Sequence, residues 1–267
     1  MTHVYAFAPP RSQIRSGPVA FLPKSLPENT GLAFIGEAVW PAALLTDRQA
    51  QKLVSANNRC GRPNTDVLRR RLAVVDGERV EVWQIDFPDH FTQQEAALYE
   101  EPFDHLQRHA PDWKNPHANP ALRRALARVS RYLAMPARAD LPDWIWIEDE
   151  LIPDASLVAV ARDDDFTHGV LASDVFAAWH RAYGATLPPD QLIESFPLPW
   201  PPATGLSGLT ATQEESRHAV ARAIRAGNRA ALHEAIRHAY GWPVDLPETE
   251  LRDKVSALQL TRSASLR

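Results

Sequence analysis

The sequence predicts an α+β fold, with a small mixed or antiparallel sheet, flanking helices and a small all-α C-terminal appendage. Three observations lead to this prediction: strand-like segments and a hairpin signal in the first two thirds, capped helices between them, and purely helical patterns after position 205. We expect an irregular segment or linker over residues 1–25, a main domain over residues 26–202 and a helical region over residues 203–267.

Composition narrows the class of protein. The 267 residues are 45% hydrophobic, enough for a real core, and the net charge is −4 with a pI of about 6.2. This balance argues against a polyanion binder that relies on bulk charge, but it leaves room for a local arginine-rich face. The one cysteine, Cys60, excludes an internal disulfide and a Cys-rich zinc site. Without a leader-like or membrane-spanning apolar run, we expect a soluble cytoplasmic protein with no membrane contact.

The first readable elements are a helix and a hairpin. Thr46 and Gln49 form a capping box that predicts a helix over residues 46–56. Strand patterns over residues 72–75 and 80–86 flank Asp-Gly, a strong hairpin signal. Residues 57–72, between the helix and the hairpin, are predicted to be loop.

This predicted loop is rich in arginine. The guanidinium forks of Arg62, Arg69, Arg70 and Arg71 suit phosphates or the O6 and N7 atoms of guanine. Asn64 and Asp66 could contact base edges or hold a turn. A solvated basic loop explains the same residues equally well.

Two further helices are predicted between residues 92 and 109. Thr92 and Glu95 cap a helix to Glu100, and Pro102 opens a second helix. On that helix, His105 and His109 have the spacing of metal ligands, but no third ligand is identifiable, which favours ordinary histidines.

Asn119 and Pro120 mark a helix start. Its apolar stripe is predicted to run through Leu133, and a second face carries four arginines: Arg123, Arg124, Arg128 and Arg131. A phosphate-tracking face and a solvated polar face both remain open.

The central region predicts buried strands over residues 144–147 and 156–161, apolar on both faces. The acids at 163–165 fit a helix N-cap better than a Mg²⁺ site. Ser173 or Asp174 caps the helix that follows.

Near the C-terminus, the proline-rich segment over residues 197–202, with Ala203-Thr204-Gly205, is predicted to be a linker. The narrow stripes of three later helices, starting at Thr212, Asn228 and Pro247, predict an appendage that packs on something else.

Seven landmarks in order resemble the target recognition domain of MmeI-like (type IIL/IIG) restriction–modification DNA methyltransferases. They cover residues 29–36 (NTGLAFIG), 61–68 (GRPNTDVL), 83–87 (WQIDF), 95–103 (EAALYEEPF), 161–171 (ARDDDFTHGVL), 194–201 (ESFPLPWP) and 239–243 (AYGWP). The sequence departs from the family pattern at residues 113–117, which are shorter and less basic, and at residues 187–194, which replace a Ser/Thr-rich stretch. The resemblance implies a fold like that of a DNA target recognition domain followed by the family's helical C-terminal region.

The resemblance also sets expectations about catalysis. The family's Gly-rich S-adenosylmethionine loop and Asn-Pro-Pro-Tyr motif do not occur, and Asn115-Pro116-His117 and Asn119-Pro120-Ala121 have the wrong third residue. We therefore expect no catalytic domain and no cofactor in this chain, with S-adenosylmethionine bound only by a partner methyltransferase. The chain is expected to be a stand-alone specificity protein or the product of a split or truncated gene.

The leading hypothesis is a sequence-specific double-stranded DNA recognition module of a restriction–modification or phage-defence system, aided by a methyltransferase or nuclease chain in trans. The residues expected to contact DNA are Arg62, Asn64, Asp66, Arg69, Arg70, Arg124, Arg128 and Arg138. The last three are expected to contact the phosphate backbone of the DNA. The alternatives are a protein–protein specificity or regulatory subunit remnant, suggested by the 8 tryptophans, and an active adenine-N6 methyltransferase or endonuclease. Homology alone could also give the chain a methyltransferase's name.

Overall fold

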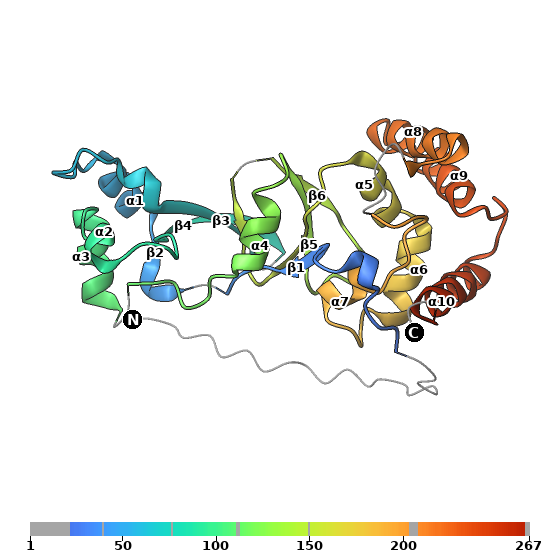
Figure 1. The fold of residues 1–267 in the computed structure, drawn as a ribbon, viewed down its shortest axis with the longest axis horizontal. Helices are drawn as coiled ribbons and strands as arrows, with labels where there is room; N and C mark the ends of the chain where they lie inside the picture. The colour runs from blue at the N-terminus through green and yellow to red at the C-terminus, as the bar shows by residue number, and fades with distance from the viewer. Residues whose placement is uncertain are drawn as a thin grey trace.

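The computed structural model describes residues 22–264, except residues 39, 76, 111–112, 149 and 203–207. It confirms the α+β class, with two four-stranded sheets where the sequence predicted one. The molecule is elongated: α1 to α3 lie at one end, the two sheets and α4 follow, and α5 to α10 form the other end (Figure 1). The irregular segment predicted over residues 1–25 falls mostly outside the described residues.

The first sheet has the strand order β2-β4-β3-β7. Its strands are β2 (Leu44–Leu45), β3 (Leu68–Val75), β4 (Glu78–Ile85) and β7 (Ile152–Pro153). Five helical elements accompany it at this end: η2 (Pro41–Ala43), α1 (Asp47–Ser55), η3 (Asn64–Val67), α2 (Gln93–Ala96) and α3 (Glu100–His109). Both predicted capping boxes are confirmed, at Thr46 and at Thr92.

The hairpin of β3 and β4 is confirmed, with an antiparallel register from Leu68↔Ile85 to Val75↔Glu78. The loop prediction for residues 57–72 is wrong at its end, because β3 begins at Leu68 and includes the arginine run. The strand period of two places Arg69 and Arg71 on one face and Arg70 on the other.

The second sheet is antiparallel, in the order β1-β8-β5-β6. Its strands are β1 (Ala33–Ile35), β5 (Tyr132–Pro136), β6 (Ile145–Ile147) and β8 (Leu157–Val160). The chain leaves this sheet after β1, builds most of the first sheet, and returns through α4 (Pro120–Leu126) to β5. The predicted central strands are confirmed, although β5 lies between β6 and β8.

The start of α4 is confirmed, since the Asn119 side chain accepts hydrogen bonds from the backbone N–H groups of Ala121 and Leu122. Its predicted length is wrong. The helix ends at Leu126, and Leu133 belongs to β5, where it is fully buried. The apolar spacing of this segment suited a helix, but the residues after the turn pair with β6 and β8 instead.

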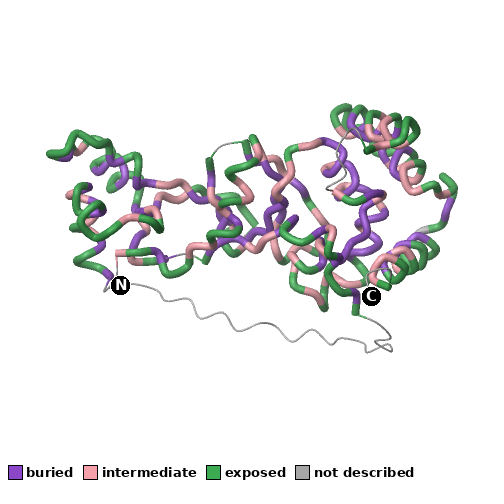
Figure 2. The backbone as a smooth tube through the Cα atoms, viewed as in Figure 1, coloured by how far each residue is buried: buried purple, intermediate pink, exposed green. Residues whose placement is uncertain are grey.

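The second sheet is covered on both faces (Figure 2). Side chains such as Leu133, Val158 and Val160 pack toward α5 to α7, and those of Tyr132, Ala134 and Ala159 pack toward α4 and the first sheet. This arrangement confirms the prediction of a buried central sheet and explains why its strands are apolar throughout.

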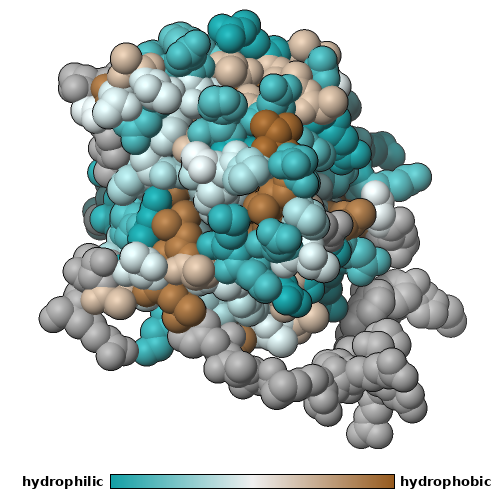
Figure 3. All heavy atoms as spheres, turned by 90° about the vertical axis from the view of Figure 1, so that its right-hand side faces the viewer, coloured by the Kyte–Doolittle hydropathy of each residue, from teal (hydrophilic) through white to brown (hydrophobic). Residues whose placement is uncertain are grey.

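The far end is helical. It contains α5 (Asp165–Leu171), α6 (Asp174–Tyr183), α7 (Pro189–Glu194), α8 (Ala211–Arg225), α9 (Arg229–Tyr240) and α10 (Glu248–Ala264), with η1 (Pro27–Asn29) beside α7. The N-caps at Asp164, Ser173 and Asn228 agree with the predictions. The cap of α8 is Thr210 rather than the predicted Thr212. Seen from this end, hydrophobic residues form separate patches on a largely hydrophilic surface (Figure 3).

The segment predicted as a linker is packed over its described part, which corrects that prediction. Phe196, Leu198 and Trp200 are buried, and the Trp200 ring stacks on Phe166 at 4.4 Å between centroids. The carbonyl oxygens of Pro197 and Pro199 accept hydrogen bonds from the helical end. The prolines therefore shape a buried turn of the core rather than a flexible tether.

Candidate functional site

A cavity of about 630 Å³ lies between the two sheets. One wall comes from β3 and the segment after β4, a second from α4 and its turn into β5, and a third from the β6–β7 connection. The floor is apolar and includes Leu126, Val129 and Ile147. Charged side chains of both signs also line it: Arg69, Arg123 and Arg131 with Asp86, Asp89, Glu148 and Glu150. Its volume is that of an ordinary ligand site in proteins.

Arg69 is the cationic side chain that β3 contributes to this cavity. Its Nη1 donates to the carbonyl oxygens of Thr65 and Leu68, each at 3.2 Å. Within the described part of the chain, no carboxylate lies at ion-pair distance from it. Its charge is therefore available to an acceptor that enters the cavity.

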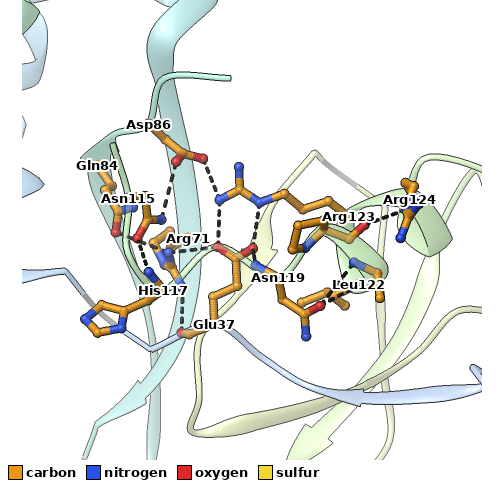
Figure 4. Close-up of polar contacts among 12 residues, drawn as sticks. Glu37, Arg71, Gln84, Asp86, Asn115, His117, Asn119, Leu122, Arg123 and Arg124 are labelled. Carbon is orange, nitrogen blue, oxygen red and sulfur yellow. Dashed lines mark hydrogen bonds and ion pairs between the residues drawn. The ribbon is translucent and has the colours of Figure 1, made fainter. Parts of the chain in front are cut away.

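Glu37 forms the centre of a buried ionic network (Figure 4), two members of which, Arg123 and Asp86, line the cavity. Its Oε1 accepts from Arg123 Nε at 2.6 Å and from the Asn119 backbone N–H at 2.8 Å. Its Oε2 accepts from Arg123 Nη2 at 2.8 Å and from Arg71 Nη1 at 3.3 Å. The Glu37 carbonyl oxygen also accepts from Arg71 Nη2 at 2.6 Å. One residue thereby joins β1, β3 and α4.

Arg123 extends the network to the end of β4. Its Nη2 lies 2.8 Å from Asp86 Oδ2, and Asn115 donates to the other oxygen of Asp86 at 3.4 Å. Gln84 accepts from Arg71 Nη1 at 3.2 Å. The carboxylates of Glu37 and Asp86 and the guanidinium groups of Arg71 and Arg123 thus form one network, in which Arg123 is partly exposed.

The network changes the proton affinity of its members. Burial raises the pKa of Glu37, but hydrogen bonds from Arg123 and Asn119 and the charges of Arg123 and Arg71 outweigh it, so the pKa lies below its ordinary value. Burial likewise lowers the pKa of Arg71, partly opposed by Glu37 and nearby aspartates. For Arg123, hydrogen bonding to Glu37 and the Asp86 charge exceed the effect of burial and raise the pKa. Glu37 and Arg123 are therefore charged near neutral pH.

Arg131, on the cavity wall, is held from two sides. Its guanidinium lies 3.8 Å from the centre of the Trp146 ring, and Nη2 is 2.7 Å from Asp165 Oδ1. Asp165 is also paired with Arg225 of α8. Arg131 therefore forms part of the cavity wall and stacks on Trp146, and Asp165 compensates its charge.

The structure gives Asn64 a structural position rather than the expected contact with a base edge. Its side chain is buried, donating to the carbonyl oxygens of Leu53 and Ala56 at 2.8 and 3.2 Å and accepting from Asn58 Nδ2 at 2.7 Å. These bonds tie the segment after α1 back onto the helix. The amide is enclosed, which leaves Asn64 outside any ligand surface.

Arg62 and Asp66 lie on the outer, exposed part of the same segment. Asp66 Oδ2 accepts from the Tyr99 hydroxyl at 3.0 Å. Burial, the hydrogen bond to Asp66 and the Asp66 charge raise the pKa of Tyr99, against an opposing effect of Arg62. The loop that carries Arg62 projects beyond α1 at the end of the molecule, away from α4 (Figure 1).

The three consecutive arginines of β3 have three different environments. Arg69 lines the cavity, Arg70 is 2.9 Å from Glu81 across the hairpin, and Arg71 is fully buried against Glu37. The suggestion that Arg71 suits a phosphate is therefore wrong, since no part of its side chain reaches solvent.

Arg124, Arg128 and Arg138 are exposed around α4 and the end of β5. Arg124 turns away from the ionic network and donates to the Pro120 carbonyl oxygen at 3.1 Å (Figure 4). Among the described residues, none of these three arginines forms an ion pair. Arg124 and Arg128 do not line the cavity, but each is adjacent in sequence to residues that do, Arg123, Ala127 and Val129.

Sequence reasoning missed Glu37 and Asp86. One signal was present for Glu37, because it is a lone acid inside the otherwise apolar run from Leu32 to Trp40. Such a charge requires a buried partner. The partners, however, lie 34 and 86 residues away, and spacing gives no indication of them.

The two metal sites considered from the sequence, at the histidines of α3 and at the acids over residues 163–165, have ordinary structural roles. The His105 and His109 rings stack at 4.4 Å, and His109 Nδ1 lies 2.7 Å from the His105 carbonyl oxygen. Asp164 caps α5 by accepting from the Thr167 N–H. Over the described ranges, no group of three His, Cys, Asp or Glu side chains has the geometry of a metal site, and no helix has the length and apolarity to cross a bilayer.

The fold is similar to that of a solved structure of the Type IIL restriction–modification enzyme MmeI in complex with DNA. The TM-score is 0.55 at 14% sequence identity, and the match covers 94% of this chain and 37% of the length of the MmeI chain. Neither the protein-family models nor the curated proteins compared with the sequence give a match.

Proposed function

We propose that this chain is a sequence-specific double-stranded DNA recognition module of a restriction–modification system. The observation that carries the proposal is the set of uncompensated arginines about the cavity: Arg69 on one wall, with Arg124 and Arg128 adjacent in sequence to residues of a second wall. The neighbouring Arg71, Arg123 and Arg131 have buried carboxylate partners, so the open positive charges about the cavity are those of Arg69, Arg124 and Arg128. Similarity over 94% of the chain to a DNA-bound restriction–modification enzyme supports the same proposal.

The proposed roles follow from the chemistry of each position. Arg124, Arg128 and Arg138 are exposed and would dock the protein on phosphates, which fixes its register on the duplex. Arg69 lies in the cavity with Glu148 and Glu150. An arginine fork donates to guanine O6 and N7, and carboxylates accept from base amino groups, so this mixture suits base edges better than phosphates. Arg62 would contact a separate part of the duplex.

The net charge implies that a partner assists DNA binding. With a net charge of −4, bulk attraction to DNA is absent, and the few open arginines give modest affinity. A methyltransferase or nuclease chain in trans would add contacts, and S-adenosylmethionine would belong to that partner. This arrangement predicts stronger DNA retention when such a partner is present.

The test is selection from a randomised duplex pool, with and without a candidate methyltransferase, at low and moderate salt. We expect enrichment of one short motif. Arg69→Ala should weaken binding by about 1–3 kcal/mol and relax one position of the motif. Arg128→Ala should weaken all sequences alike and reduce the salt slope by about one. Arg229→Ala, an exposed arginine at the start of α9, is the matched control and should change neither quantity.

A folded protein that binds no duplex under any of these conditions would refute the proposal. Binding that enriches no motif, with Arg69→Ala and Arg128→Ala behaving alike, would reduce it to phosphate contact alone.

A further inference from the structure

The arginines of the proposed DNA surface belong to different parts of the fold. Arg69 is in β3 of the first sheet, whereas Arg124 and Arg128 accompany α4, which leads into β5 of the second sheet. A split surface can match one register of DNA only if its two parts are held at a fixed separation and angle. The inference below rests on the proposed function and concerns the group that holds them.

Glu37 makes the contacts that such a joint requires. Its carboxylate receives Arg71 from the first sheet, and Arg123 and the Asn119 N–H from α4. Its carbonyl oxygen accepts from Arg71 and from the Ala155 N–H at 3.0 Å, in the turn before β8. The side chain is fully enclosed, so Glu37 cannot touch a ligand itself.

The partners of Glu37 are immediate neighbours of the open arginines. Arg71 lies two residues from Arg69 on the same face of β3, and Arg123 is adjacent to Arg124. Figure 4 shows Arg123 turned toward Glu37 and Asp86, with Arg124 turned away. A shift at the carboxylate is thus transmitted to each half of the surface through one or two residues.

We infer that Glu37 is a positioning residue that sets the relative placement of Arg69 and Arg124, and through it the sequence specificity of DNA binding. Affinity for phosphates depends on charges that Glu37 leaves in place. The expected signature is therefore loss of discrimination between sequences without loss of the electrostatic contribution to binding.

The test variant is Glu37→Gln in the full chain. Glutamine keeps the size, but its amide N–H₂ faces guanidinium donors and leaves at least one of them unpaired. We expect the affinity ratio between the selected motif and random duplex to fall by roughly tenfold. The salt slope of random-duplex binding should stay unchanged. Glu101→Gln, which removes an exposed ion pair with Lys52, is the matched control.

A second measurement is independent of DNA. Spin labels at the native, exposed Cys60 and at Gln191→Cys report the separation of the two ends, since Gln191 lies on α7, which packs beside β1. We expect a narrow distance distribution for the parent and a broadened or shifted one for Glu37→Gln. If Glu37→Gln does not fold, Arg123→Lys replaces it, because lysine keeps the charge but loses the fork that grips both carboxylate oxygens.

Unchanged distances together with an unchanged affinity ratio would overturn the inference. So would a parallel loss of affinity and salt slope, which indicates general unfolding. If the parent binds no DNA at all, the proposed function fails, and the label distances still decide whether Glu37 holds the two sheets together.

Discussion

At the scale of single residues, the Glu37 carboxylate accepts four hydrogen bonds from three residues in a place that water does not reach. Removing one partner of a buried ion pair costs roughly 3–5 kcal/mol because the other charge is left uncompensated. The two buried atoms in this region without a hydrogen-bond partner are Arg71 Nε and Gln84 Nε2, both donors. The site is thus short of acceptors, which makes the Glu37 charge more important.

This environment predicts a pH dependence of stability. The pKa of Glu37 is lower in the folded protein than its ordinary value of 4.5, so the unfolded chain binds a proton first. The stabilisation is complete above that ordinary value and is lost as the pH falls through the folded pKa. Urea unfolding at stepped acidic pH values should show this loss. A folded Glu37→Gln variant should lack this component of the pH dependence, and an identical profile would contradict the assignment.

At the scale of elements, the close approach of β1 to the β7–β8 turn depends on one glycine. A Cβ on Gly36 would lie 2.1 Å from the Asp154 carbonyl oxygen and 2.5 Å from that of Pro153, both rigid backbone atoms. The same approach brings Glu37 into its bridge with Asp154. A side chain at position 36 would collide with the backbone of residues 153 and 154, so glycine is required there.

Overpacking usually costs about 1–3 kcal/mol. Gly36→Ala should lower the free energy of unfolding by an amount above that range, because backbone rather than side chains would have to move. Gly61→Ala is the comparison: its φ is 75°, but no described atom lies within 4 Å of the added Cβ. That change should cost about 1 kcal/mol through backbone conformation alone. Equal losses in the free energy of unfolding, measured by urea denaturation, would show that the close approach is unimportant.

The elements also show what the sequence could and could not predict. Caps at Thr46, Asn119 and Asn228 were predictable because the capping group and its target are three residues apart or fewer. The end of α4 was not, because Val129 and Leu133 continue a helical spacing although β5 begins at Tyr132. The buried position of Asn64 was not predictable either. Its side chain donates to the backbone carbonyl oxygens of Leu53 and Ala56, and backbone partners leave no signal in the sequence.

At the scale of the whole molecule, the C-terminal helices and the second sheet share one core. Val220, Ile236 and Val255 are completely buried in the same cluster as Trp179 and Val160. The division at position 203 remains a prediction of the sequence. The shared core gives it a physical test, because an independent appendage would leave the rest of the chain folded.

A fragment that ends at residue 202 should lose cooperative thermal unfolding and bind a hydrophobic dye, because it exposes the face that α8 to α10 cover. Circular dichroism melting and dye fluorescence, with the full chain as control, measure this. A fragment that melts sharply, without dye binding, would establish two separable domains.

The path of the chain past Glu37 and Asn119 has a further consequence. The chain leaves the second sheet beside Glu37, builds β2 to β4 and α1 to α3, and returns at Asn119, whose N–H lies 2.8 Å from the Glu37 carboxylate. Other links to the rest of the chain include the backbone pairing of β3 with β7 at Arg71↔Ile152 and Leu72↔Pro153, and the ion pair of Arg123 with Asp86. A genetic exchange with crossover points at Glu37 and Asn119 would therefore transfer β2 to β4 and α1 to α3 together, as one segment. Descendants could inherit a new set of contacts while the central sheet kept its register.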